Sequence, residues 1–245
     1  SKLHREPEML NRTTLKRALT GAAVAATAML VACQATQPTV KDYSAFRAEN
    51  PQSILVLPAL NNSGSVTAPE FFLSTISQPF AQRGYYVFPA NMVKSLLEEE
   101  GLADPSLLYE ADAKRLGNIF GCDSALYLAI QKWESQYMVL ATSTNVAFDY
   151  ELRSCKTGDV LWSTSKQIAY SPQASNSGNP LADLIAQAVI SAIEKGSPNY
   201  IPLAQQANAA AANFPGQGLP AGPYLPEQYG NDLEYFPAGQ VSAQE

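Results

Sequence analysis

The spacing of apolar residues changes part-way along the chain, and this change limits the folds that the sequence can form. Residues 53–60 (SILVLPAL) are a short continuous apolar run that Pro58 and the following NNSGS end, which is typical of a fully buried strand. Residues 145–153 (NVAFDYELR) alternate instead, and their inward positions are Val146, Phe148, Tyr150 and Leu152. The first pattern predicts a fully buried strand, and the second predicts a strand with one wet face.

Helical patterns separate the first strands from one another. A helix is predicted from Pro69 onward, with a kink or an end at Pro79, and a second strand follows at residues 85–90. Asn91 is expected to cap the next helix. Asp104, followed by Pro105, is expected to cap the one after it, which ends at Gly121. The remaining predicted elements are strands at 124–133, 145–153 and 159–170 and a helix at 180–192. This order predicts a single α+β domain, whose mixed sheet starts parallel, continues as an antiparallel meander and carries packed helices.

The apolar segment of residues 18–32 is too short to cross a bilayer as a helix. Arg12, Lys16 and Arg17 precede it, as in a secretion signal. Its end, Leu30-Val31-Ala32-Cys33, resembles the bacterial lipobox. The resemblance implies cleavage before Cys33 and lipid attachment to that cysteine, whose thiolate is the nucleophile that the transfer needs.

The residue after Cys33 bears on the membrane that would receive the protein. It is Gln34, where an aspartate commonly retains such lipoproteins at the inner membrane. The resemblance therefore implies a lipid-anchored protein on the periplasmic face of the outer membrane. Residues 33–245 carry 11 basic and 20 acidic residues, a net charge of −9, which argues against a nucleic-acid partner and leaves lipid as the membrane anchor.

Composition divides the chain into four parts. Proline and alanine are frequent near the end of the chain, where periodic patterns stop. The predicted parts are a signal segment (1–32), a lipidated tether (33–50), the α+β domain (51–197) and a Pro/Ala-rich tail (198–245). Six aromatic residues in the tail predict that parts of it dock. We expect residues 200–214 to dock on the domain and residues 219–230 to contact a partner.

The residue types present exclude several kinds of catalysis. The one histidine, His4, precedes the lipobox, so the mature chain has neither a Ser-His-Asp nor a Cys-His set nor a histidine-dependent zinc site. No nucleotide-binding or nucleophile-elbow motif is present. Asp149 and Glu151 share one strand face about 7 Å apart, a spacing that inverting glycosidases use, but alternate acids are also the ordinary composition of a wet face. We therefore expect a protein that is not an enzyme, with no cofactor and no metal.

Two further sets of residues are candidate sites. Cys122 and Cys155 would lie near adjacent ends of neighbouring strands, which permits a disulfide in an oxidising compartment. Their positions are out of phase in the alternation, so a bridge needs a break in the strand near residue 155, and both a bridge and free thiols stay open. The candidate partner surface is aromatic, although packing at the sheet edge would equally explain its strand residues. It comprises Trp133, Tyr137, Tyr224 and Tyr229.

Four stretches together resemble a family of bacterial lipoproteins of unknown function whose genes often lie beside one for a CsgG-like secretion lipoprotein. They are ILVLPALNNSGS, GCDSALYLAIQKWESQYMVL, CKTGDVLWS and LPAGPYLPEQYGND. The resemblance implies a domain like the N-terminal domain of TolB, which is also seen in CsgG and LpoB. It also implies an envelope protein as partner, with a CsgG-like lipoprotein as one candidate. We expect an accessory or assembly subunit of an envelope or transport complex that acts by protein binding. The alternative is a carrier of a small ligand or lipid.

Overall fold

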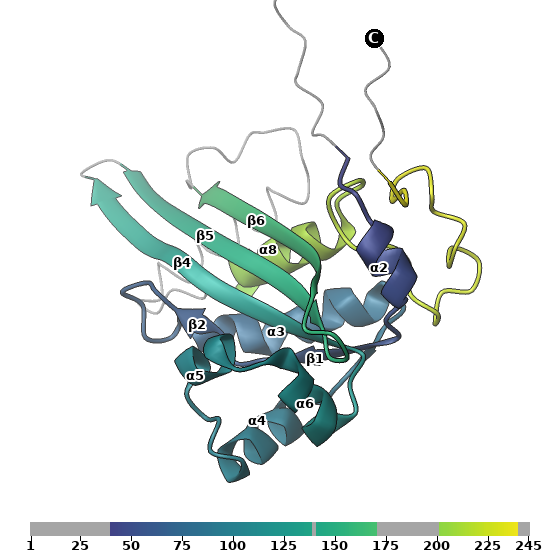
Figure 1. Ribbon diagram of the computed structural model, residues 1–245. Coiled ribbons are helices and arrows are strands. Elements are labelled where there is room, and N and C mark those ends of the chain that lie inside the picture. Colours follow the sequence, from purple (N-terminus) through teal and green to yellow (C-terminus); the bar gives the residue numbers. More distant parts are fainter. Residues whose placement is uncertain (1–39, 139–140, 171–200, 240–245) are drawn as a thin grey trace, which may run out of the picture. The chain divides into compact units, whose positions relative to one another are not determined.

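A mixed β-sheet organises the part of the chain that the computed structural model describes, residues 40–138, 141–170 and 201–239. Its strands lie in the order β3-β1-β4-β5-β6, with β2 paired to β4. Figure 1 shows β4, β5 and β6 side by side. β1 is parallel to β3 and to β4, β2 is parallel to β4, and β4, β5 and β6 are antiparallel. The strands are β1 (Ser53–Val56), β2 (Leu60–Asn61), β3 (Tyr86–Val87), β4 (Ser124–Met138), β5 (Ala141–Ser154) and β6 (Val160–Tyr170). The predicted parallel start and antiparallel meander are confirmed.

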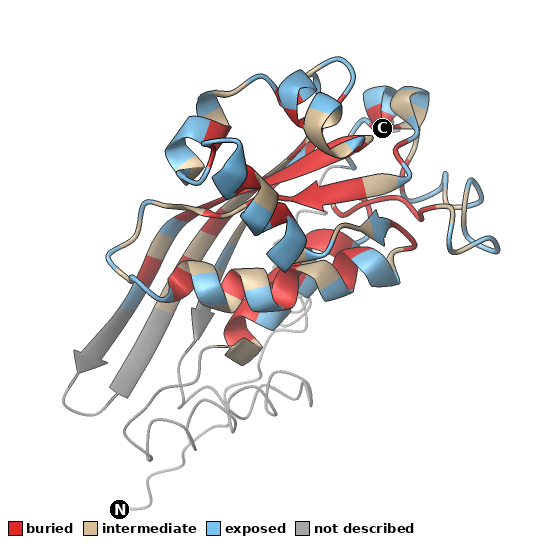
Figure 2. Cartoon of the chain, turned by 90° about the horizontal axis from the view of Figure 1, so that it is seen from below, coloured by how far each residue is buried: buried red, intermediate tan, exposed pale blue. Residues whose placement is uncertain are grey.

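Helices cover the two faces of this sheet unequally. The described helices are α2 (Ser44–Glu49), α3 (Ala68–Gln82), α4 (Ala90–Glu99), α5 (Pro105–Glu110), α6 (Ala113–Phe120) and α8 (Ile201–Asn213). One apolar cluster joins the sheet to α2, α3 and α8, and a second joins the other face to α4, α5 and α6. Buried residues accordingly gather on the strands and on the helix sides that face them (Figure 2). Among the described helices, none has the length and apolar character needed to span a membrane.

The side chains of β4 show how one strand serves both clusters. Leu126 and Leu128 belong to the first cluster, whereas Ala125 and Tyr127 belong to the second. Alternation places these pairs on opposite faces of the strand. The second face is uncovered farther along, where Gln131 is exposed and Asp149 of β5 is partly exposed. The continuous and the alternating sequence patterns therefore correspond to the covered and the open parts of the sheet.

Several element boundaries differ from prediction for local reasons. The predicted strand at 53–60 is split into β1 and β2 around Pro58, which has no N–H to donate to a neighbouring strand. α3 continues to Gln82 beyond the buried Pro79, so that proline does not end the helix. Asn91 lies inside α4, whose N-cap is Pro89. The helix predicted from Asp104 to Gly121 is two helices, because the Asp112 side chain accepts a hydrogen bond from the Lys114 N–H and caps α6. The helix predicted at 180–192 lies outside the described residues.

The predicted tether at 33–50 overlaps the folded part of the chain. Tyr43 and Phe46 are buried in the first cluster, and residues 44–49 form α2. The Tyr43 ring stacks edge-on against Phe236, so the two ends of the described chain pack together. The described part of that segment therefore belongs to the domain, because its aromatic side chains complete the core.

The predicted tail also belongs to the fold over most of its described length. α8 buries Leu203 and Ala207 against the core, as expected for the first docking piece. The C-terminal segment, residues 214–237, then crosses the same side of the molecule, where Leu219 and Phe236 are buried. The boundary predicted at 197/198 is thus not a boundary of the core.

Main-chain carbonyls hold the start of the C-terminal segment in place. Four consecutive carbonyls, at residues 217–220, accept hydrogen bonds from side chains that come from distant elements. The donors are Trp162 Nε1 at 2.9 Å, Tyr43 Oη at 2.7 Å, Arg83 Nη2 at 2.6 Å and Tyr85 Oη at 2.8 Å. Burial raises the pKa of both tyrosines, so both stay protonated donors. The acceptors are main-chain atoms, which every residue has. The side chains of residues 217–220 therefore do not predict these hydrogen bonds.

Candidate functional site

An apolar groove lies where β1 and β3 end, between helices that cover opposite faces of the sheet. Its volume is about 470 Å³. β1 connects through β2 and α3 to β3 on one side, and β3 connects through α4–α6 to β4 on the other. The chain therefore leaves neighbouring strands toward opposite faces, which opens a crevice beyond their carboxyl ends. The groove occupies this crevice.

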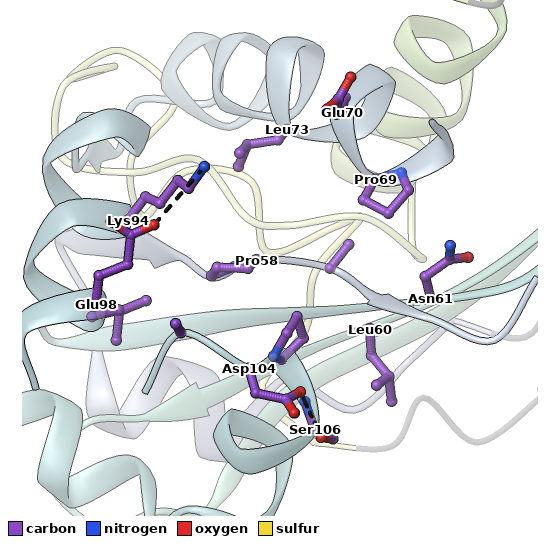
Figure 3. Close-up of a pocket in the computed structure, with 14 residues that line it drawn as sticks. Pro58, Leu60, Asn61, Pro69, Glu70, Leu73, Lys94, Glu98, Asp104 and Ser106 are labelled. Atoms are coloured by element: carbon purple, nitrogen blue, oxygen red, sulfur yellow. Dashed lines mark hydrogen bonds and ion pairs between the residues drawn. The ribbon is translucent and has the colours of Figure 1, made fainter. Parts of the chain in front are cut away.

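The walls of the groove come from four elements (Figure 3). Pro69 and Leu73 line the groove from α3, Leu97 lines it from α4, and Pro105 lines it from α5. Pro58 lies on the chain that crosses between them. Because proline fixes its own φ and lacks an N–H, these walls are rigid and offer few main-chain donors. A second hollow, lined in part by Pro89 and Ala90, shares Glu70 and Leu73 with the groove and extends it along α3.

Charged side chains stand around this apolar lining. Lys94 and Glu98 form an ion pair with Nζ 4.0 Å from Oε1, and both are more than half exposed. The Asp104 carboxylate accepts hydrogen bonds from the Ser106 hydroxyl and N–H, which lower its pKa and keep it charged. Glu70, in the first turn of α3, makes no ion pair with another described residue. Three acids and one base thus line the groove, a formal charge of −2.

The predicted aromatic surface does not form one patch. Trp133 is buried in the core, where its ring contacts Phe71, Phe72 and Phe148, so its place in a partner surface is wrong. Tyr137 lies on β4 opposite Thr142, and its side chain lies outside the described set. The alternative of packing at the sheet explains Trp133.

The two tail tyrosines lie on the C-terminal segment. Tyr224 is 67% exposed, and its main-chain N–H donates to the Gly84 carbonyl. Tyr229 is partly buried, and its hydroxyl donates to Asn50 Oδ1 at 2.7 Å. Among the members of the predicted aromatic set whose side chains the structure describes, Tyr224 is therefore the largely exposed one.

Cys122 and Cys155 are joined by a disulfide in the structure, with their Cα atoms 5.9 Å apart. Both cysteines lie just beyond the last strand pair, Ser124 with Ser154, so the phase mismatch in the alternation does not oppose the bridge. A side chain at Gly117 of α6 would clash with the Cys155 carbonyl oxygen. The disulfide therefore lies where α6 and the turn that contains Cys155 are in close backbone contact. Cys33 lies outside the described residues.

Asp149 and Glu151 lie on the open face of the sheet, as predicted. Asp149 accepts hydrogen bonds from Gln131 at 2.8 Å and Ser165 at 2.6 Å, and Glu151 pairs with Arg153. Both carboxylates are thus engaged within the face, which fits the ordinary interpretation of alternate acids on a wet strand. Among the described residues, no group of three or more histidine, cysteine, aspartate or glutamate side chains is placed to hold a metal ion.

Comparison with known proteins adds a family to this geometry. The model of the family described as "Putative lipoprotein GNA1162-like" matches residues 41–223, which include the groove and both cysteines of the disulfide. The chain belongs to this family. A relative in Neisseria meningitidis serogroup B, "Putative lipoprotein NMB1124/NMB1162", is 34% identical over 170 residues, 69% of this chain and 78% of the relative.

The solved structure of a GNA1162 lipoprotein supports the fold. The crystal structure of lipoprotein GNA1162 from Neisseria meningitidis is 32% identical, covers 59% of this chain and 99% of its own, and superposes with a TM-score of 0.50. The C-terminal domain of LpoB from Escherichia coli aligns at 17% identity over 49% of this chain and 84% of its own, with a TM-score of 0.38.

The groove is the part of the site that sequence patterns missed. Its signals were present as three prolines, each next to a predicted element boundary: Pro58, Pro69 and Pro105. Each was interpreted alone, as a strand or helix boundary. Only the strand order brings them together, because the crevice arises where connections diverge to opposite faces of the sheet.

Proposed function

We propose that this GNA1162-like lipoprotein is an accessory subunit of an envelope assembly or transport complex, which it serves by binding another protein. Family membership supports a lipid anchor, and the lipobox-like end of the signal supports Cys33 as its attachment point. Gln34 supports the outer membrane, with the domain on the periplasmic side. A CsgG-like lipoprotein is the first candidate partner, and the likeness of the domain to the N-terminal domain of TolB is part of the same proposal.

The groove is the observation that carries this function. It combines apolar walls, rigid prolines and a charged rim on the family-matched part of the chain. It is open along its length rather than enclosed, since its extension along α3 is lined by exposed residues such as Ser74 and Asn91. An open apolar groove suits a protein segment, whose ends must leave the site.

Recovery of a partner from crosslinked membranes tests the function. Ala103 is exposed and lines the groove, so Ala103→Trp should fill the groove without disturbing the core. Ala209 is an exposed alanine on α8, away from the groove, and Ala209→Trp is the matched control. The proposal predicts a stoichiometric envelope protein with the natural chain and with the control, and its loss with Ala103→Trp. Equal recovery with both variants, or no envelope protein under several growth conditions, contradicts it.

The anchor is tested separately. Cys33→Ser should release the protein from membranes into soluble or unprocessed forms, while its thermal unfolding stays that of the natural chain, since Cys33 is not among the residues of the described core. Membrane fractionation with circular dichroism measures both. Retention at the membrane, or loss of folding, would contradict Cys33 as the site of lipid attachment.

A carrier of a small ligand or lipid is the second candidate. The groove volume of about 470 Å³ lies within the range of roughly 300–1,000 Å³ that small-molecule sites occupy. Native mass spectrometry of the protein extracted in mild detergent distinguishes the two. A co-purified small molecule that Ala103→Trp displaces would favour the carrier, and its absence leaves protein binding as the better account.

A further inference from the structure

From the open edge of β2 we infer that the groove binds its partner as an added β-strand, and that this partner segment is extended, apolar and basic. The inference rests on the proposed function and names the chemistry of the partner. Three observations carry it: an unpaired strand edge, apolar walls on both sides of that edge, and an acidic rim.

The strand edge is open because β3 is short. β3 pairs with Ser53 and Ile54 of β1, and the Phe88 N–H donates to the Ile54 carbonyl at 3.2 Å. The next residue, Pro89, has no N–H, and α4 begins at Ala90. β3 therefore stops beside the first half of β1. Within the described part of the chain, β2 pairs with β4 alone.

The free edge of β2 faces the groove. The Asn62 N–H donates to the Ile130 carbonyl of β4 at 2.9 Å. Peptide groups of a strand alternate between its two edges, so the N–H and C=O of Asn61 point away from β4. Asn61 and Leu60 both line the groove. An extended segment lying along this edge of β2, in line with β3, would hydrogen-bond the N–H and C=O of Asn61.

The flanking helices would cover both faces of the added strand. α3 contacts β2 from one face and α5 from the other, and they present Leu73 and Pro105 to the groove. A strand has side chains on both faces, and here each face would meet an apolar wall. Strand addition with flanking pockets is an established mode of peptide recognition, in which main-chain bonds supply affinity and the pockets supply specificity.

The negative charge of the groove lining favours a positively charged partner segment. The groove lining carries Glu70, Glu98 and Asp104 against Lys94. Lys94 is already paired with Glu98, which leaves Glu70 and Asp104 without a cationic partner among the described residues. Complementarity favours lysine or arginine on the incoming segment over aspartate or glutamate.

Short synthetic peptides test the mode of binding on the detergent-solubilised full chain. The probe is a fluorescent peptide with a central run of alternating leucine and valine and lysines at both ends, and the comparison peptide replaces the lysines with glutamates. Fluorescence anisotropy should show binding of the lysine peptide and at least about tenfold weaker binding of the glutamate peptide. Glu70→Lys should weaken binding of the lysine peptide, whereas Glu99→Lys, an exposed acid of α4 outside the groove, should not.

Methylation of the peptide backbone separates strand addition from other binding. Two versions of the lysine peptide carry N-methyl groups either on every leucine or on every valine of the central run, so each blocks one edge of the strand. Strand addition predicts that one version loses about tenfold or more in affinity while the other still binds. The inference is overturned if both methylated versions bind with the affinity of the unmethylated peptide, or if no peptide binds. If membrane crosslinking still recovers a partner that Ala103→Trp loses, the proposed function stands and only strand addition fails.

Discussion

The disulfide region and the C-terminal segment are both peripheral to the sheet, but different interactions attach them. Cys122 and Cys155 join the start of β4 to the turn after β5 through a covalent bond inside an apolar cluster. The C-terminal segment, residues 214–237, is held by hydrogen bonds to its carbonyls and by one carboxylate, Asp232, between two arginines. The first attachment depends on residue types that a sequence displays, and the second depends on backbone positions that it does not.

Removal of the disulfide should have the largest effect of the changes considered. The bridge closes 33 residues, and the chain-entropy model gives roughly 3–4 kcal/mol for a loop of this size. Cys122→Ala with Cys155→Ala should lower the free energy of unfolding by about that amount in urea denaturation. Reductant should destabilise the natural chain similarly and leave the double variant unchanged. Two freely alkylated thiols in the unreduced, denatured protein would show that the bridge is absent.

Gly222 should be almost as sensitive, although it lies in the segment predicted as a tail. A Cβ there would clash with the Gly84 carbonyl oxygen, and the Gly222 N–H donates to the Arg83 carbonyl at 2.7 Å. Gly222→Ala should therefore cost about 3 kcal/mol, as overpacking against fixed backbone does. Gly64→Ala, where a Cβ meets nothing within 4 Å, is the control and should be nearly neutral. A melting temperature of Gly222→Ala equal to that of the control would remove the segment from the cooperative fold.

Asp232 holds the C-terminal segment to the domain through ion pairs. Its Oδ1 is 2.6 Å from Arg47 Nη2, its Oδ2 accepts the Ala221 N–H at 2.6 Å, and Arg83 lies 3.7 Å away. The side chains are 12–18% exposed, so Asp232→Ala would leave two largely buried arginines without their carboxylate and should cost about 2 kcal/mol. Glu227→Ala, an exposed acid of the same segment, serves as the control. Equal chemical denaturation midpoints for the two variants would contradict a structural role for this ion pair.

These attachments show which parts of the fold the sequence could predict. Periodic side chains predicted β4, β5 and β6, the cap at Asp104 and the mixed sheet, because each signal is local. Tyr43 and Phe46 were assigned to a tether since two aromatic residues in a polar stretch have no period, and their partner Phe236 lies far along the chain. The groove was missed for the same reason, as its walls meet only once the strand order is known.

Lys41 offers the smallest and most specific test of that N-terminal region. Its amine donates to the Ser163 carbonyl on β6, and burial, with a smaller contribution from the Lys166 charge, lowers the pKa of Lys41 to about 8. The unfolded chain then binds more protons than the folded one between about pH 8 and the usual lysine pKa of about 10.4. Stability of the natural chain should rise slightly with pH across that window, relative to Lys41→Met. Parallel stability curves for the two proteins would place the Lys41 amine in free solvent.

Site-specific photocrosslinking tests the central claim most directly, because it asks which surface of the folded, anchored protein touches a partner. A photoreactive phenylalanine analogue placed at Ala103 lies in the groove, and the same analogue at Ala209 lies on α8. Irradiation of intact cells should yield a discrete adduct with an envelope protein from position 103 and none from position 209. Adducts of the same partner from both positions, an adduct within the chain itself from position 103, or an adduct from position 209 alone would contradict the groove as the binding site.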